Sequence, residues 1–109
     1  MALSVESRLI INEREYWEVK LRGDVDIANA ADFRAALREA YFEKPADIII
    51  DASELSYIDS TGLGVIIGAY GRMRDKGHGI LIENPKANVK KLLNITSLDK
   101  IFCQEEVLA

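Results

Sequence analysis

The stretch from Ile48 to Met73 constrains the fold more than any other part of the sequence, because it joins an apolar run to a helix through a polar loop. The run Ile48 to Ile50 is consecutive and β-branched, which is typical of a strand buried on both faces of a parallel sheet. We predict that Asp51 ends this strand. A helix is predicted to follow within about a dozen residues, because apolar side chains then recur at helical spacing: Leu63, Ile66, Ile67, Tyr70 and Met73.

Three residues that commonly cap helices, Asp59, Ser60 and Thr61, lie where this helix should begin. The first backbone N–H groups of a helix have no internal partner, and short polar side chains accept hydrogen bonds from them. Since only one residue can be the cap, at least one hydroxyl is left over, and Ser60 is our candidate. Gly62 and Gly64 remove side chains from the first turn, which we expect to leave the backbone and the Ser60 hydroxyl open to a partner.

The N-terminal half is predicted to form a hairpin followed by a helix. Strands are predicted at residues 8–12 and 16–22, the second from its alternating apolar and polar residues, with a turn at residues 12–15. The following helix has Asn29 or Asp26 available as its cap. Its buried face is predicted from the helical spacing of Phe33, Ala36, Leu37, Ala40 and Tyr41.

The C-terminal part is predicted to add a strand and a helix. Ile80 to Ile82 is a short apolar run, and Asn84-Pro85 begins the helix, with Asn84 as the cap and proline in the first turn. We assign Ile101 to Cys103 to a short edge strand. Gln104 to Ala109 is assigned to a final helical turn.

The predicted topology brings polar residues together at one edge of the sheet. Strands ending at Leu21, Ile50 and Ile82 run parallel because helices connect them, so the loops after them share the carboxyl edge. Open α/β sheets place their working sites there. The opposite edge receives Lys44, Lys76 and His78, and the carboxyl edge receives Asp24, Asp26, Asp59, Ser60, Glu83 and Asn84.

Catalytic and cofactor sites do not fit this pattern. A nucleophilic Ser60 needs a base within hydrogen-bonding reach, but His78, the only histidine, lies beyond the far end of the same helix, roughly 20 Å away. Gly62 and Gly64 lack the spacing of a dinucleotide fingerprint or a P-loop. The nearby aspartates offer oxygen ligands, but ordinary turn capping explains them. We therefore expect no catalytic residue, no cofactor and no metal.

Composition limits the remaining classes. The 109 residues, 49% of them apolar, suffice for one core, so we expect a single domain at residues 1–109. A net charge of −4 argues against nucleic acid or an anionic membrane as the partner. The single cysteine, Cys103, and an N-terminus without an apolar export signal indicate a cytoplasmic protein.

The segment Ile58-Asp59-Ser60-Thr61-Gly62-Leu63-Gly64 closely resembles the phospho-acceptor segment of the anti-sigma factor antagonists, the bacterial members of the STAS domain superfamily. Gly23-Asp24-Val25-Asp26 is similar to another segment of that family, and residues 95–102 extend the resemblance over most of the chain. The resemblance implies an α/β fold. It would be a STAS-like single domain, with a mixed sheet of four to five strands, an N-terminal hairpin and helices packed on the sheet.

The resemblance also implies a function. In this family the serine directly after the aspartate is phosphorylated, a role that carries over to Ser60. The unphosphorylated form is expected to bind an anti-sigma factor that is itself a serine kinase, freeing the sigma factor; phosphorylation switches binding off and a serine phosphatase restores it. The alternative is a STAS-like scaffold or adaptor, such as a stressosome or lipid-transport component, without a phosphorylation cycle. The residues expected to bind the partner are Asp24, Asp26, Asp59, Ser60, Thr61, Gly62 and Gly64.

Three further glycine positions raise a question about the same helix. Gly64, Gly68 and Gly71 fall on one flank of it. Each glycine inside a helix costs about 1 kcal/mol relative to alanine, so a steric reason is expected. Close packing of a helix from Pro85 to Leu93 best explains Gly68 and Gly71, whereas docking of the kinase better explains Gly64, one turn from Ser60.

Overall fold

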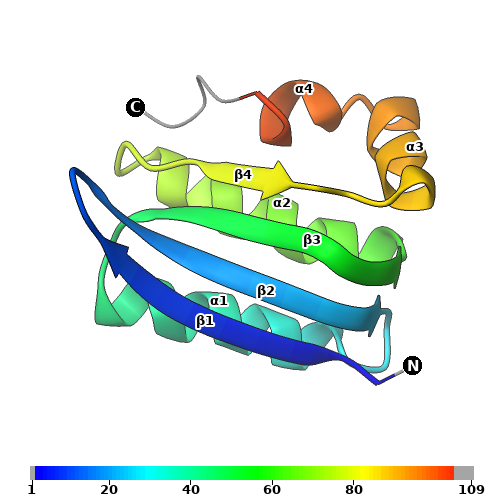
Figure 1. Cartoon of the computed structure of the whole chain (residues 1–109), viewed down its shortest axis with the longest axis horizontal. Helices are drawn as coiled ribbons and strands as arrows, with labels where there is room; N and C mark the ends of the chain where they lie inside the picture. The colour runs from blue at the N-terminus through cyan, green and yellow to red at the C-terminus, as the bar shows by residue number, and fades with distance from the viewer. Residues whose placement is uncertain (1, 105–109) are drawn as a thin grey trace.

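The protein, described over residues 2–104 by a computed structural model, is built on one four-stranded sheet with the order β1-β2-β3-β4 (Figure 1). β1 is antiparallel to β2, whereas β2, β3 and β4 are mutually parallel. The predicted mixed sheet with an N-terminal hairpin is therefore confirmed. The strands are β1 (Ser4–Ile11), β2 (Glu15–Val25), β3 (Asp47–Ile58) and β4 (Ile80–Glu83).

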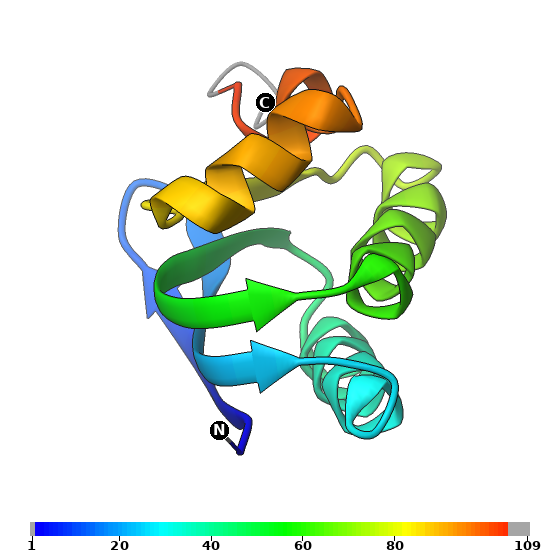
Figure 2. The ribbon, with the colours of Figure 1, turned by 90° about the vertical axis from the view of Figure 1, so that its right-hand side faces the viewer.

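Two long helices cover one face of the sheet. α1 (Ala30–Glu43) connects β2 to β3, and α2 (Ser60–Arg74) connects β3 to β4. α3 (Ala87–Ile95) and α4 (Asp99–Phe102) lie beyond them along the chain, at the β4 side of the sheet (Figures 1 and 2). No helix within residues 2–104 combines the length and the apolar character that a membrane span requires.

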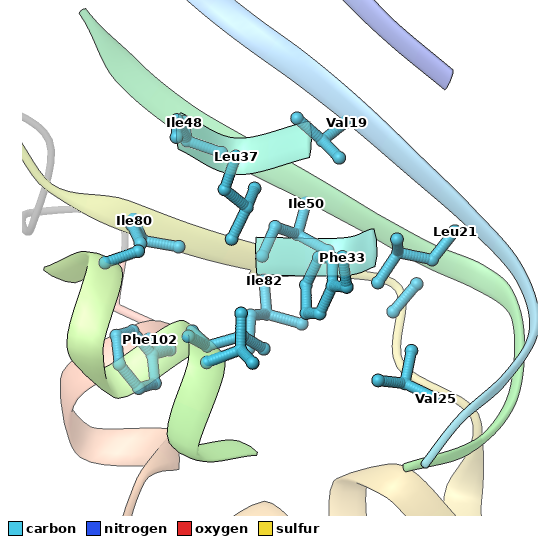
Figure 3. Packing of buried hydrophobic residues seen from close by; sticks show 14 of the residues in the cluster. Val19, Leu21, Val25, Phe33, Leu37, Ile48, Ile50, Ile80, Ile82 and Phe102 are labelled. Carbon is cyan, nitrogen blue, oxygen red and sulfur yellow. The ribbon is translucent and has the colours of Figure 1, made fainter. Parts of the chain in front are cut away.

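The core lies between the sheet and these helices (Figure 3). Each parallel strand contributes alternate side chains to it, because successive residues of a strand point to opposite faces. Phe33 and Leu37 of α1 are fully buried against them. Burying one such side chain stabilises the fold by about 1.5–3 kcal/mol, so this packing holds α1 against the sheet. The strand residues labelled in Figure 3 are Val19, Leu21, Val25, Ile48, Ile50, Ile80 and Ile82.

The intervening residues of β2 point to the other face, where they form ion pairs with neighbouring strands. Arg8 of β1 pairs with Glu18 of β2, and Arg22 of β2 pairs with Glu6 of β1. Glu54 of β3 accepts from both Lys20 (2.8 Å) and Arg22 (3.3 Å). This face of the sheet is exposed to solvent. Exposed ion pairs of this kind contribute only about 0–1 kcal/mol each to stability.

β2 and β3 are longer than the sequence predicted. β3 continues through Asp51 to Ile58, so the prediction that Asp51 ends the strand is wrong. The carboxylate of Asp51 accepts the Ser53 N–H at 3.0 Å, and irregular register between Lys20 and Arg22 lets the second half of β3 pair with β2. Asp24 therefore lies within a strand, one residue before Val25 ends β2.

The C-terminal predictions need two corrections. Asn84 does not cap α3; it has a left-handed φ of 57°, and the helix begins at Ala87 with Lys86 as its N-cap. Residues 101–103 form no strand, because Phe102 is the last residue of α4 and packs edge-on against Tyr70 with ring centroids 5.5 Å apart. The predicted final helical turn, beyond Gln104, lies outside the described residues.

Candidate functional site

The site is formed where β2 and β3 end side by side and lead into α1 and α2 (Figure 2). The Asp59 N–H donates to the carbonyl oxygen of Val25 at 3.1 Å, which joins the two strand ends. The predicted carboxyl edge is therefore present, and it brings the segments around Asp24 and Ser60 together.

Asp59 is the N-cap of α2, as one of the three candidate residues had to be. Its Oδ1 accepts the Gly62 N–H at 2.9 Å, and its Oδ2 accepts the Ile27 N–H at 3.2 Å. One carboxylate therefore holds both the first turn of α2 and the loop after β2. Loss of an N-cap side chain typically costs about 1 kcal/mol, and this one has a second task.

Ser60 is the first residue of α2 and is exposed. Its hydroxyl makes no hydrogen bond within residues 2–104, because Asp59 already provides the cap. Thr61 is half-buried beside it. The arrangement leaves one accessible hydroxyl at a helix start, next to a carboxylate.

The loop between β2 and α1 is closed by its own polar side chains. Asp26 Oδ1 accepts the Ala28 N–H at 2.9 Å, and Asn29 Oδ1 accepts the Asp26 N–H at 2.9 Å. Asn29 Nδ2 also donates to the carbonyl oxygen of Asp24 at 2.9 Å. Asn29, rather than Asp26, occupies the N-cap position of α1, which was one of the two predictions. Its side chain makes no cap hydrogen bond. It organises the loop instead, a role that the sequence did not reveal.

The two glycines of the first turn of α2 have different surroundings. Gly62 is buried, and a Cβ there would lie 2.6 Å from Val25 Cγ1 and 2.7 Å from Ile58 Cγ1. The prediction that both glycines leave the backbone open is thus wrong for Gly62, whose missing side chain lets α2 approach the strand ends. Gly64 is exposed, with nothing within 4 Å of an added Cβ.

The glycine flank of α2 faces open space. Beside Gly68 a Cβ would meet only the Arg72 guanidinium at 3.5 Å, and beside Gly71 it would meet nothing within 4 Å. Close packing of the helix after Pro85 is therefore the wrong explanation for Gly68 and Gly71. The flank is a bare, solvent-facing continuation of the surface that contains Ser60 and Gly64.

Exposed apolar side chains border this surface, and sequence reasoning missed them. Ile27, whose N–H is bonded to Asp59, is 79% exposed, and Ile67 of α2 is 45% exposed. Ile67 was predicted on the buried face, but seven residues of helix return it to within about 20° of Ser60. Ile27 directly follows the predicted site residue Asp26, and this position in the sequence could have indicated that Ile27 belongs to the site. Large apolar side chains grouped around a polar centre are typical of protein contact surfaces.

The predicted site residues are thus placed as follows. Asp59, Ser60 and Gly64 lie on the surface at the start of α2, with Asp26 in the adjoining loop. Asp24 is half-buried near the end of β2, where that strand still pairs with β3, just before that loop. Within residues 2–104 no three metal-binding side chains are grouped to hold an ion.

Comparisons with known proteins agree with this architecture. The STAS domain model matches residues 12–108. An anti-sigma-B factor antagonist of Bacillus subtilis is 33% identical over 85 residues, covering 78% of this chain and 77% of that protein. Its counterpart in Listeria monocytogenes is 33% identical over 105 residues, covering 94% of this chain and 88% of that protein.

A solved structure gives the same result for the fold. The anti-sigma factor antagonist SpoIIAA, in its unphosphorylated form, superposes with a TM-score of 0.74 at 25% identity, covering 93% of this chain and 90% of that one. The chain therefore belongs to the STAS domain family, and over most of its length it is similar to anti-sigma-B factor antagonists.

Proposed function

We propose that the chain is an anti-sigma factor antagonist controlled by phosphorylation of Ser60. In this proposal the unphosphorylated protein binds an anti-sigma factor that is also a serine kinase, and so frees the sigma factor. Phosphorylation of Ser60 ends this binding, and a serine phosphatase resets the protein in the cytoplasm. The chain itself contributes no catalytic residue.

One observation carries the proposal: Ser60 is an exposed helix-start residue whose hydroxyl has no hydrogen-bond partner within residues 2–104. A kinase needs an acceptor hydroxyl that is accessible and not already bonded. Asp59 supplies the capping that a serine at this position would otherwise provide, so modification of Ser60 does not remove the cap.

The charges around Ser60 explain how a phosphate would act as a switch. A phosphoserine adds about −1.5 to −2 charges, and it would stand beside Asp59, close to the loop that contains Asp26. The Gly62 N–H, which a phosphate at a helix start would otherwise use, is already bound by Asp59 at 2.9 Å. The new charge is therefore added next to the Asp59 carboxylate, and by repulsion and desolvation it blocks a partner that docks on this surface.

The relatives support the same function. The proteins that the chain resembles along most of its length are named anti-sigma-B factor antagonists, and SpoIIAA is described by its phosphorylation state. The open surface formed by Ser60 and Gly64, with the exposed side chains of Ile27 and Ile67 beside it, is suited to a protein partner.

The test is phosphorylation by the anti-sigma factor kinase of the same organism. Wild-type protein, Ser60→Ala and the matched control Thr61→Ala are incubated with the kinase and ATP, and phosphate is located by mass spectrometry. We expect Ser60→Ala to lose all incorporation while it keeps kinase binding, and Thr61→Ala to keep phosphate incorporation. Full incorporation into Ser60→Ala would reject Ser60 as the acceptor.

A further inference from the structure

A groove of about 800 Å³ lies between the C-terminal halves of α1 and α2, at the end of the molecule opposite Ser60. Sites for small molecules usually measure about 300–1,000 Å³ and have mainly apolar linings. Nothing in the proposed switch uses this groove. Its apolar floor consists of Leu37, Tyr41, Pro45, Ala69 and Met73, and Phe42 also lines it.

One wall of the groove is held rigidly. The Tyr41 hydroxyl is hydrogen-bonded to His78 Nδ1 at 2.6 Å, and the two rings meet edge-on with centroids 5.5 Å apart. Lys76 Nζ lies 5.7 Å from the centroid of the Tyr41 ring. Burial raises the pKa of Tyr41, and the nearby charge of Asp47 raises it further, so the hydroxyl stays neutral. A wall that is already ordered loses little entropy when a ligand binds.

Phe42 stands at the mouth of the groove and is 92% exposed. No other large apolar side chain among residues 2–104 is exposed to this degree. Because Phe42 adjoins an apolar floor rather than standing alone, an apolar ligand in the groove would cover it.

Three cations line the same groove: Arg38 from α1, Arg72 from α2, and Lys76 from the turn that follows α2. None of them has a carboxylate within salt-bridge distance among the described residues, whereas Arg8, Lys20 and Arg22 on the sheet face are all paired.

The surrounding charges do not account for these cations fully. Glu39 and Asp75 also line the groove, but Asp75 is engaged by Arg74 at 4.0 Å. Arg72 lies in the last turn of α2, where it partly offsets the helix dipole. Arg38 is not in the last turn of α1, so the dipole does not explain it. In a chain of net charge −4, cations without carboxylate partners around an apolar floor are complementary to an anion that carries an apolar chain.

We propose that this groove binds a small amphiphile with an apolar chain and one anionic head group, such as a medium-chain carboxylate. The chain lies on the floor between Met73 and Leu37, where it covers Phe42, and the head group is held by Arg38 and Arg72. Charge-assisted hydrogen bonds from guanidinium to carboxylate are the stronger kind, so the head group sets the selectivity. The site is separate from Ser60.

The test is a titration of isotope-labelled full-length protein with sodium octanoate, followed by amide chemical shifts. Octanol serves as the uncharged probe of the same chain length. We expect saturable shifts confined to the C-terminal halves of α1 and α2, with octanoate binding about tenfold more tightly than octanol, equivalent to about 1.4 kcal/mol.

Variants separate the two parts of the site. Arg38→Gln combined with Arg72→Gln should weaken octanoate binding about tenfold, to the level of octanol, and leave octanol binding unchanged. Phe42→Ser should weaken both probes. Lys90→Gln combined with Lys91→Gln removes two exposed charges from α3 and should change neither. Amide dispersion of each variant verifies that it is folded, and Ser60→Ala should bind octanoate like the wild type.

Three results would overturn the proposal. Equal affinity for octanol and octanoate would show that the cations do not contribute to binding. If neither probe caused saturable amide chemical shift changes, the groove would not be a binding site for such ligands. Binding to phosphatidylglycerol vesicles without binding to free octanoate would identify the groove as a contact for a lipid surface instead. None of these results depends on whether Ser60 is phosphorylated.

Discussion

The two ends of the sheet each depend on one carboxylate, but they use it differently. At the end opposite Ser60, Asp47 is buried; its Oδ1 accepts the Gly79 N–H at 2.8 Å, and its Oδ2 lies 3.9 Å from Arg14. At the carboxyl edge, Asp59 is half-buried and both of its oxygens accept backbone N–H groups.

The difference lies in what remains beside each carboxylate. Next to Asp47 the Tyr41 hydroxyl and His78 are bonded to each other, so the hydroxyl at that end is already engaged. Next to Asp59 the Ser60 hydroxyl is exposed and unbonded within residues 2–104. The carboxyl edge thus combines a fixed backbone with an accessible hydroxyl, which is the combination that a modification site requires.

The largest effect should come from Gly62→Ala, which tests how tightly the carboxyl edge is packed. The added Cβ would lie 2.6 Å from Val25 Cγ1, and overpacking of this kind typically costs about 1–3 kcal/mol. We expect a matching loss in the free energy of unfolding, measured by urea denaturation.

Gly64→Ala is the matched control for Gly62→Ala, because an added Cβ meets nothing within 4 Å there. It should keep or gain stability, by up to about 1 kcal/mol, and lose kinase binding. If both substitutions are tolerated equally, the strand ends and α2 are not held as closely as the structure describes.

Asp47→Ala tests whether Asp47, at the opposite end, serves stability alone. The Gly79 N–H would lose its side-chain acceptor inside the protein, at a cost of about 1–3 kcal/mol. Phosphorylation of the remaining folded protein should proceed at the wild-type rate. Asp47→Asn keeps an acceptor oxygen and should be milder. A large loss of phosphorylation in folded Asp47→Ala would mean that the two ends are coupled.

The smallest change in stability should come from Asp26→Asn. The amide oxygen can still accept the Ala28 N–H that Asp26 Oδ1 binds at 2.9 Å, so the free energy of unfolding should change by less than about 0.5 kcal/mol. Binding to the anti-sigma factor, measured by calorimetry, should nevertheless weaken because a charge of the docking surface is lost. Asp75→Asn, at the far end of α2, should leave binding intact. Lower stability with unchanged binding would show that Asp26 acts only in its turn.

The sequence predicted the parts of this molecule that depend on local chemistry. The apolar run at Ile48 and the helical spacing after Leu63 predicted the strand and α2, and the choice of caps predicted Asp59 or a neighbour at the helix start. The carboxyl edge followed from the parallel connections. Each of these features is determined by residues close together in the chain.

The parts that the sequence did not predict depend on distant partners. β3 passes through Asp51 because β2 continues beside it, and α4 forms where Phe102 packs against Tyr70. Gly62 reveals its purpose only once Val25 and Ile58 are seen against it. Periodicity carries no information about such contacts, so tertiary packing overrode the local pattern in each case.

β1 is one of the two edge strands, with one side paired to β2 and the other side unpaired in the sheet. Its charged residues Glu6 and Arg8 alternate with Val5 and Leu9, which pack against the core. A slip of β1 by one residue would turn both charges inward, so misaligned pairing is strongly disfavoured. A second molecule adding its own strand here would meet the same charges, which natural proteins use to resist aggregation along open strands. The charges whose ion pairs add little to folding stability therefore disfavour strand pairing between copies along the β1 edge.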